Sequence, residues 1–200
     1  MPPTIVLAAR HGQSTWNADG RWQGHADPPL STLGAAQARA AVSAIGAVDV
    51  VVASDLVRAR DTAMAIADAL GVGPVVVDEN LRETDAGPWT GLTRAEIADG
   101  WPGWLADGRR PEGFEAAEDV TRRGRAALVR IHHAYPGSTV LAITHVGVIR
   151  AVERSCGADD GTLPNLGGRY FTVDGDSLTL GDRVLLINPD EIAITVPTAL

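Results

Sequence analysis

The chain has 200 residues, of which 45% are hydrophobic and 21% charged, a composition typical of a compact globular protein. This length suits one core, so we expect a single domain over residues 1–200. The net charge of −8 argues against binding nucleic acid or anionic membranes, because such surfaces carry a basic excess. All 17 residues counted as Lys or Arg are arginine, which excludes a P-loop lysine and a Schiff-base lysine.

Cysteine usage and the N-terminus indicate the compartment. The single cysteine, Cys156, excludes a disulfide framework and a thiolate metal site. Residues 1–4 lack the basic and apolar segments of an export signal, and no apolar run approaches membrane-spanning length. We therefore expect a cytoplasmic protein with no membrane partner.

Strand and helix patterns alternate along most of the chain. Such alternation predicts an α/β fold, a three-layer α/β/α sandwich with a mostly parallel central sheet. Short alternating segments after residue 168 predict an antiparallel C-terminal edge. The predicted strands are 4–9, 48–53, 75–77, 139–143, 170–173, 177–180 and 183–187, and the predicted helices are 31–45, 56–70, a short one from 93, 116–134 and 146–153.

Helix ends and faces are also predicted from the pattern. Ser31 is a suitable cap for the first long helix, whose apolar positions include Leu33, Ala36, Ala40 and Ile45. The next helix is predicted to be capped by Ser54 or Asp55 and to end at Gly71.

A triplet of Arg10, His11 and Gly12 directly follows the first predicted strand. In open parallel sheets the ligand crevice lies outside the carboxyl ends of the strands. A cationic side chain, an imidazole and a residue without a side chain at such a place predict an anion site. Since His145 follows a second such strand, we expect both histidines at one edge of the sheet.

Five sequence blocks follow one another between about residues 4 and 150. They are Arg10-His11-Gly12-Gln13-Ser14 with Asn17; Arg21-Trp22-Gln23-Gly24 with Asp27, Leu30, Gly34 and Gln37-Ala38; Ser54-Asp55-Leu56-Val57-Arg58-Ala59 with Thr62-Ala63; Leu81-Arg82-Glu83 with Gly87, Trp89 and Gly91-Leu92-Thr93; and 140–147 with Thr144-His145. This ordered set closely resembles the signature of the histidine phosphatase superfamily, which includes the phosphoglycerate mutases.

The residue types match the chemistry of phosphate transfer, and the resemblance implies the same roles. Arg10 and Arg58 can present planar forks to phosphate oxygens, and a protonated His145 can add a third positive donor. His11 is then the nucleophile that forms a phosphohistidine. Glu83 is the expected proton donor to the leaving group and later the base that activates water.

This scheme requires specific protonation states. Burial and a nearby phosphate dianion should raise the pKa of Glu83, while His11 stays neutral and His145 is positive. We therefore predict a pH optimum between mildly acidic and neutral. The resemblance further implies substrate contacts from Asn17, Gln23 and the amide of Gly24, and the backbone amide of Val146 could serve in the same way.

Each of these residues also has a structural interpretation. A histidine at a strand end is often a hydrogen-bonded core residue, Arg58 could face solvent, and Glu83 could form a surface ion pair with Arg82. Asn17 and Gln23 could simply cap turns. For His25 a loop position is expected; for His132 and His133, an interaction with the helix dipole. Trp16, Trp22, Trp89, Trp101 and Trp104 could line a lid or pack in the core.

Two positions depart from the family pattern. Gly113-Phe114-Glu115-Ala116 stands where many relatives have Gly-Glu-Ser, so only Glu115 is carried over. His145-Val146-Gly147 replaces His-Gly-Gly, and the added side chain narrows the expected substrate range.

The sequence favours hydrolysis over isomerisation. Mutases of the family carry a long basic insertion after the Glu loop, whereas about twenty residues separate Gly91 from Gly113 here. Because Arg94, Arg109 and Arg110 lie in this segment, a cofactor-dependent phosphoglycerate mutase remains an alternative function. A non-catalytic phosphate-binding protein is a second alternative. The expected partner is a small phosphate ester, with no cofactor and no metal site. The C-terminal edge could support a homodimer.

Overall fold

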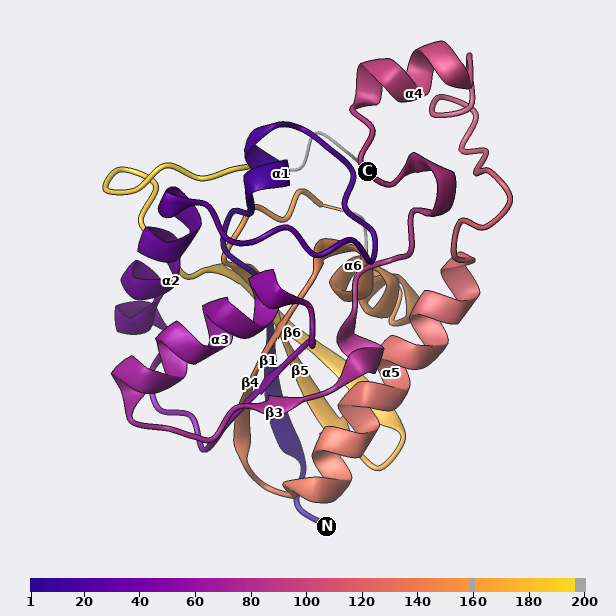
Figure 1. Ribbon diagram of the computed structural model, residues 1–200. Coiled ribbons are helices and arrows are strands. Elements are labelled where there is room, and N and C mark those ends of the chain that lie inside the picture. Colours follow the sequence, from indigo (N-terminus) through magenta and orange to yellow (C-terminus); the bar gives the residue numbers. More distant parts are fainter. Residues whose placement is uncertain (159–160, 197–200) are drawn as a thin grey trace.

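The computed structural model describes residues 1–158 and 161–196 of the chain. Its core is a six-stranded sheet with the order β3-β2-β4-β1-β5-β6 (Figure 1). The first four of these strands are parallel to one another, and β5 and β6 are antiparallel. The predicted α/β class and the antiparallel C-terminal edge are confirmed.

The elements alternate as the sequence pattern predicts. In chain order they are β1 (Thr4–Arg10), α1 (Thr15–Ala18), α2 (Thr32–Ile45), β2 (Val50–Ala53), α3 (Val57–Leu70), β3 (Val76–Val77), the 3₁₀ turns η1 (Glu79–Leu81) and η2 (Gly87–Trp89), α4 (Arg94–Gly100), α5 (Ala117–Ala134), β4 (Thr139–Thr144), α6 (Val146–Ser155), β5 (Gly167–Asp174) and β6 (Ser177–Leu185).

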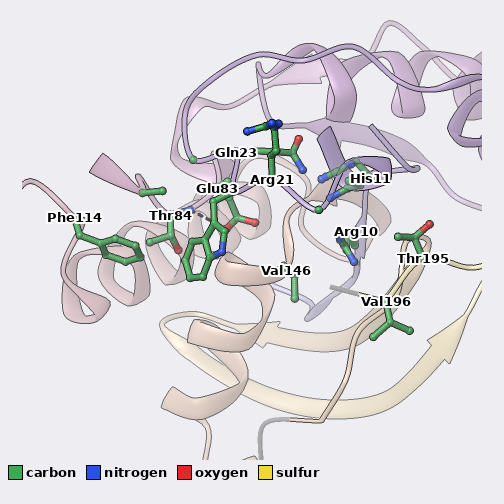
Figure 2. A pocket seen from close by; sticks show the side chains of 15 residues that line it. Arg10, His11, Arg21, Gln23, Glu83, Thr84, Phe114, Val146, Thr195 and Val196 are labelled. Atoms are coloured by element: carbon green, nitrogen blue, oxygen red, sulfur yellow. Dashed lines mark hydrogen bonds between the residues drawn. The ribbon is translucent and has the colours of Figure 1, made fainter. Parts of the chain in front are cut away.

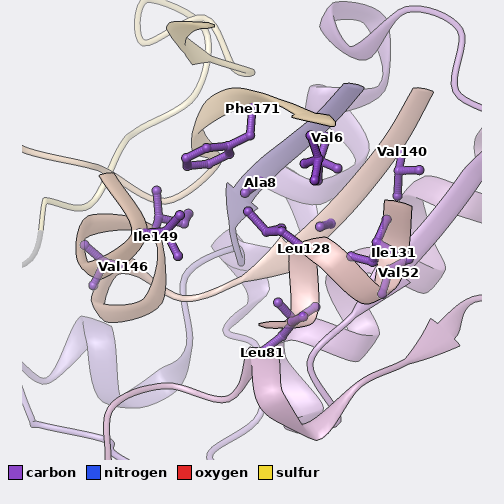
Figure 3. Packing of buried hydrophobic residues seen from close by; sticks show 14 of the residues in the cluster. Val6, Ala8, Val52, Leu81, Leu128, Ile131, Val140, Val146, Ile149 and Phe171 are labelled. Carbon is purple, nitrogen blue, oxygen red and sulfur yellow. The ribbon is translucent and has the colours of Figure 1, made fainter. Parts of the chain in front are cut away.

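Helices cover both faces of the sheet, α2 and α3 on one side and α5 and α6 on the other (Figure 1). Two hydrophobic clusters result, because alternate strand residues point to opposite faces. Val6 and Val140 pack with Leu128 and Ile149 of the α5/α6 layer (Figure 3), whereas the neighbouring strand residues pack against α2 and α3. Both faces of the central strands are therefore buried, which explains their continuous apolar sequence.

The buried face of α2 differs from the predicted one. Its buried residues are Gly34, Gln37, Ala38, Ala41 and Ile45, whereas Leu33, Ala36 and Ala40 are half-buried. The side-chain carbonyl of Gln37 accepts a hydrogen bond from the Gln13 amide at 2.8 Å, so a polar residue lies on the core side. A Cβ at position 34 would lie 1.9 Å from the Gln13 carbonyl oxygen. Glycine at this position therefore allows α2 to lie close to the backbone of Gln13.

Ser31 caps α2 as predicted, with its hydroxyl accepting from the Gly34 amide at 3.0 Å. The predicted cap of α3 was wrong. Leu56 occupies the cap position, and the Asp27 carboxylate accepts from the Val57 amide at 2.7 Å. Sequence reasoning missed it because Asp27 belongs to a loop thirty residues earlier.

The C-terminal segment forms two strands rather than the three predicted. Gly181 lies inside β6, where a Cβ would come within 2.9 Å of the Tyr170 Cβ. The pairing of β5 with β6 shifts its register between Arg169 and Phe171, as at a β-bulge. Gly181 therefore allows close strand packing instead of marking a turn.

Within the parts of the chain that the structure describes, no helix is both long and apolar enough to cross a membrane. The feature that matters for function is the edge of the sheet at which β1 and β4 end. These strands are central neighbours, and the residues that follow them meet at that edge.

Candidate active site

The parallel register of β1 and β4 brings the two predicted histidines together. Arg10 pairs with Thr144, and the His11 amide donates to the Thr144 carbonyl at 3.0 Å. His11 and His145 are the next residues of the two strands, and their ring centroids are 5.0 Å apart. The expectation that both lie at one sheet edge is confirmed by this geometry.

The hydrogen bond of His11 determines its tautomer. Its Nδ1 lies 2.6 Å from the Gly12 carbonyl oxygen, which can only accept, so Nδ1 carries the proton. The lone pair is consequently on Nε2. Burial, followed by the charges of Arg58 and Arg10, holds the pKa of His11 well below its ordinary value. The ring is therefore neutral, as a nitrogen nucleophile must be.

His145 is fully buried beside His11 and does not line the pocket. Both of its ring nitrogens are buried without a hydrogen-bond partner among the described residues. Burial and the charge of Arg58 lower its pKa well below the ordinary value. The expected positive charge is thus not the state of His145 in this structure, because burial and the neighbouring cations both disfavour it.

Arg10 presents its guanidinium to the pocket. One terminal nitrogen donates to the Leu163 carbonyl at 3.1 Å, and Nη2 makes no hydrogen bond to any residue that the structure describes. Burial lowers the pKa of Arg10 to about 10, although the Glu83 carboxylate opposes this effect. Arg10 therefore remains cationic at neutral pH with one donor available.

Arg58 is fully buried, which contradicts a solvent-facing position. Its terminal nitrogens donate to the Ala26 carbonyl at 2.8 Å and the Gly24 carbonyl at 3.0 Å. Among the described residues it does not line the pocket, so the expected fork on phosphate is absent from this arrangement. Burial lowers its pKa to about 10. Arg58 holds the 24–26 loop in place and adds positive charge behind His11.

Glu83 reaches the same pocket from the loop after η1. Its Oε1 accepts from the Thr84 amide at 2.8 Å and the Gly147 amide at 3.0 Å. Because Gly147 lies in the first turn of α6, the carboxylate caps a helix whose own cap residue, His145, supplies no side-chain bond. Arg82 pairs with Asp55 instead, so Glu83 does not form the alternative surface ion pair with its neighbour.

Asn17 and Gln23 both line the pocket and both stabilise local turns. Asn17 forms a capping box with Ser14, and Gln23 accepts from the Ser14 hydroxyl at 2.8 Å. These bonds use the amide oxygens, so the amide nitrogens of Asn17 and Gln23 are available as donors. Gly24, with φ of +50°, and Val146 also line the pocket.

Figure 2 shows the pocket, whose empty space including its mouth is about 610 Å³. Sequence reasoning missed several residues that line the pocket. For Thr195 and Val196 the sequence contains no local signal of this position. The lining residues that were not predicted are Gly20, Arg21, Thr84, Ala86, Phe114, Thr195 and Val196.

Of the five tryptophans, only Trp22 lines the pocket within the described chain. Trp22 and Trp89 are buried in a small aromatic cluster with Phe114, which also contacts the pocket. Trp101 and Trp104 are partly buried against this cluster. Most tryptophans thus pack beside the site, rather than forming a lid over it.

The other histidines have structural contacts. His25 Nε2 donates to the Glu83 carbonyl at 2.8 Å, so it contacts the acid loop rather than the pocket. His132 bonds the Thr4 hydroxyl at 3.0 Å and the Gly175 amide at 3.2 Å. In residues 1–158 and 161–196 no group of three His, Cys, Asp or Glu side chains could hold a metal ion.

A three-layer α/β protein with a neutral histidine, cationic arginines and a carboxyl group around one pocket has the composition of a phosphate-transfer site. The model of the histidine phosphatase superfamily (branch 1) matches residues 6–170. The chain belongs to this superfamily, and the resemblance inferred from the sequence blocks is confirmed.

Several of the relatives are named as phosphatases. A glucosyl-3-phosphoglycerate phosphatase of Mycolicibacterium vanbaalenii is 37% identical over 181 residues, covering 82% of this chain and 79% of that protein. The solved structure of a mycobacterial glucosyl-3-phosphoglycerate phosphatase complexed with VO3 superimposes with a TM-score of 0.80 at 30% identity, covering 88% of this chain and 96% of that one.

A bifunctional protein of Mycobacterium tuberculosis is 41% identical over 160 residues, covering 76% of this chain. The alignment spans only 44% of that relative's length. The similarity therefore concerns one part of a longer protein.

Proposed function

We propose that the chain is a metal-independent phosphomonoester hydrolase that acts on a small phosphorylated metabolite through a phosphohistidine on His11, with Glu83 as general acid and base. The observation that carries this proposal is the bond from His11 Nδ1 to the Gly12 carbonyl at 2.6 Å. It leaves the Nε2 lone pair for attack on phosphorus. The depressed pKa of His11 keeps that lone pair available into the mildly acidic range.

In the first step, His11 Nε2 attacks phosphorus as the bond to the ester oxygen breaks. The proton of Glu83 passes to the leaving alkoxide, so a neutral alcohol departs. In the second step, water attacks the phosphohistidine and gives a proton to the Glu83 carboxylate. Inorganic phosphate leaves, and both His11 and Glu83 return to their starting states.

The cations supply the electrostatic part of this mechanism. Arg10 offers its available Nη2, and the amide nitrogens of Asn17 and Gln23 add donors around the phosphoryl oxygens. The charge of Arg58 acts from behind the pocket. A bound phosphate dianion favours the charged form of His145, so this residue becomes a further donor when substrate binds.

The cofactor-dependent mutase is the weaker alternative. Arg94, Arg109 and Arg110 of the segment after the Glu loop do not line the pocket, in the part of the chain described. They are therefore poorly placed to retain a bisphosphorylated intermediate. A non-catalytic phosphate-binding protein would not need the His11 tautomer or the Glu83 carboxyl in the same pocket.

The decisive experiment measures phosphate release from a panel of metabolite phosphates and an aryl phosphate in EDTA, with wild type and His11→Ala. We expect metal-independent release that disappears in the variant. Conversion of 3-phosphoglycerate only with added bisphosphoglycerate would establish the mutase. Ligand binding without phosphohistidine formation would establish a binding protein, and maximal turnover well above pH 9 would contradict Glu83 as the acid.

Location and assembly are separate predictions. A cytoplasmic location follows only from the sequence. A homodimer would use the β6 edge of the sheet, and sedimentation of the purified chain tests it.

A further inference from the structure

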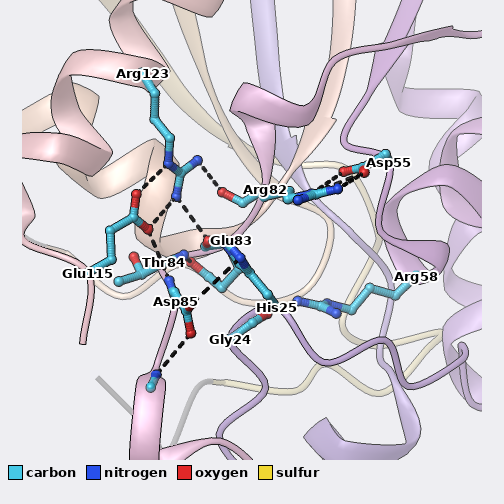
Figure 4. A network of polar contacts seen from close by, with 11 residues as sticks. Gly24, His25, Asp55, Arg58, Arg82, Glu83, Thr84, Asp85, Glu115 and Arg123 are labelled. Atoms are coloured by element: carbon cyan, nitrogen blue, oxygen red, sulfur yellow. Dashed lines mark hydrogen bonds and ion pairs between the residues drawn. The ribbon is translucent and has the colours of Figure 1, made fainter. Parts of the chain in front are cut away.

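Arg123 lies outside the pocket but holds the loop that carries Glu83 (Figure 4). It projects from α5, and 16% of its side chain is exposed. Nη1 donates to the Asn80 carbonyl at 2.9 Å and the Arg82 carbonyl at 2.5 Å, and Nη2 donates to the Glu83 carbonyl at 2.9 Å. One side chain therefore fixes three carbonyls of the loop.

Glu115 completes this arrangement. Its carboxylate accepts from Arg123 Nε at 2.7 Å and Nη2 at 2.9 Å, and 15% of its side chain is exposed. The same carboxylate accepts from the Asp85 amide at 3.0 Å, and the Glu115 amide donates to the Asp85 carbonyl at 2.9 Å. Glu115 thus orients Arg123 and also binds the loop on the far side of Glu83.

The charges of this pair are retained despite their low exposure. Burial acts to raise the pKa of Glu115, but the hydrogen bonds from Arg123 and the Asp85 amide outweigh it and hold the pKa below its ordinary value. The bidentate geometry matches a planar guanidinium to a carboxylate, which lysine does not reproduce. A neutral partner on either side would leave a nearly buried charge without its counterion.

The residues between η1 and η2 have no regular secondary structure of their own. The Glu83 side chain lies on the Gly147 amide, while its carbonyl is held by Arg123 and His25. The distance from the Glu83 carboxyl to the phosphoryl site consequently depends on this clamp. Misplacing a catalytic group by 1 Å can cost about 100-fold in rate.

We propose that Arg123 and Glu115 are positioning residues that fix Glu83 for proton transfer to the leaving group. This inference rests on the proposed role of Glu83. It concerns only the proton transfers of Glu83, because His11, Arg10 and the donors around the phosphoryl group are held by other contacts. Loss of the clamp should therefore affect esters according to how much their leaving group needs a proton.

The test compares two substrates of different leaving-group basicity. An aryl phosphate such as p-nitrophenyl phosphate releases an acidic phenol, which departs without much help from an acid. The metabolite phosphate that wild type hydrolyses best releases a basic alkoxide. For Arg123→Met we expect kcat/KM, which reports the first step, to fall about 30- to 100-fold on the metabolite phosphate. On the aryl phosphate, kcat/KM should fall less than about 3-fold. Hydrolysis of the phosphohistidine, which uses Glu83 as the base, should slow equally for both substrates.

Matched variants separate positioning from general damage. Arg122→Met changes the neighbouring residue of α5, whose side chain is 76% exposed, and should leave both substrates unaffected. Glu115→Gln keeps the size of the side chain and should reproduce the selective loss in weaker form. If Arg123→Met does not fold, Glu115→Gln tests the same inference. Arg123→Lys should recover only part of the activity that Arg123→Met loses.

Glu83→Gln distinguishes failure of this inference from failure of the proposed function. If Glu83→Gln shows no preference between the substrates, Glu83 is not the acid and the proposed mechanism is wrong. If Glu83→Gln is selective but folded Arg123→Met and Glu115→Gln lower both substrates equally, or neither, the pair is merely structural. A selective loss in all three variants supports the inference.

Discussion

The Glu83 carboxylate lies on the backbone amide of Gly147, with Oε1 at 3.0 Å from the nitrogen. A Cβ at position 147 would lie 2.1 Å from that oxygen and 2.5 Å from the Thr84 hydroxyl. The absence of a side chain is thus a condition for this contact. Gly147 connects the end of β4 with the proposed acid, although the two residues are 64 positions apart.

Gly147→Ala should therefore reduce activity without unfolding the protein. The new Cβ must displace the Glu83 carboxyl, and we expect kcat/KM on a metabolite phosphate to fall about 100-fold. Alanine favours a helix by about 1 kcal/mol over glycine, which offsets part of the strain in α6. Steady-state kinetics with thermal denaturation check both effects. Gly100→Ala adds a Cβ in open space and serves as the control; unchanged kinetics for Gly147→Ala would contradict the contact.

Gln23→Glu should weaken substrate binding. The variant keeps the size and the acceptor for Ser14, but it replaces an amide donor with a negative charge in a phosphate pocket. We expect KM to rise about 10- to 100-fold, equivalent to about 1.4–2.7 kcal/mol. Met64→Glu introduces the same charge at an exposed position outside the pocket lining. Equal KM values for the two variants would show that Gln23 does not contact the substrate.

Acid should destabilise the fold through its two site histidines. The folded-state pKa values of His11 and His145 lie well below 6.5, so the unfolded chain binds protons first as the pH falls. The free energy of unfolding that these two histidines contribute is retained above pH 6.5 and lost as the pH falls below it. The loss reaches about 2.7 kcal/mol per pH unit when both imidazoles are charged in the unfolded chain.

Urea denaturation between pH 5 and pH 7.5 measures this slope. The window lies above the range in which the carboxylates titrate, so their contribution is small. His145→Asn should remove about half of the slope, whereas His133→Asn, at an exposed position, should not change it. A slope that persists undiminished in His145→Asn would refute the assignment to this residue.

Glu153→Ala should lower stability and leave the pocket unchanged. Glu153 is fully buried and pairs with Arg169 at 2.7 Å and Arg183 at 2.5 Å. Its removal takes a buried carboxylate away from two poorly exposed guanidinium groups, and we expect a loss of about 3 kcal/mol in the free energy of unfolding. Calorimetry should show a lower Tm. Arg130→Ala breaks the more exposed pair with Asp78 and should cost less than about 1 kcal/mol; equal losses would contradict the expected effect of burial.

Local patterns were sufficient wherever a residue's position follows from its own strand or helix. His11 and His145 were predicted to meet because each follows a buried parallel strand, and the register of β1 and β4 places them side by side. A short helix was predicted from residue 93, and α4 begins there, with Thr93 as its cap in a capping box with Glu96. These signals lie within a few residues of the positions they determine.

The sequence alone therefore determined the fold class and the family, and it singled out Arg10, His11 and Glu83, which line one pocket. Only the tertiary structure decided that Arg58 binds loop carbonyls, that Thr195 and Val196 close the pocket, and that Arg123 holds the Glu83 loop. Strand and helix signals are local because backbone periodicity is local. Contacts between a side chain and a distant carbonyl carry no such period, so they exist only once the chain has packed.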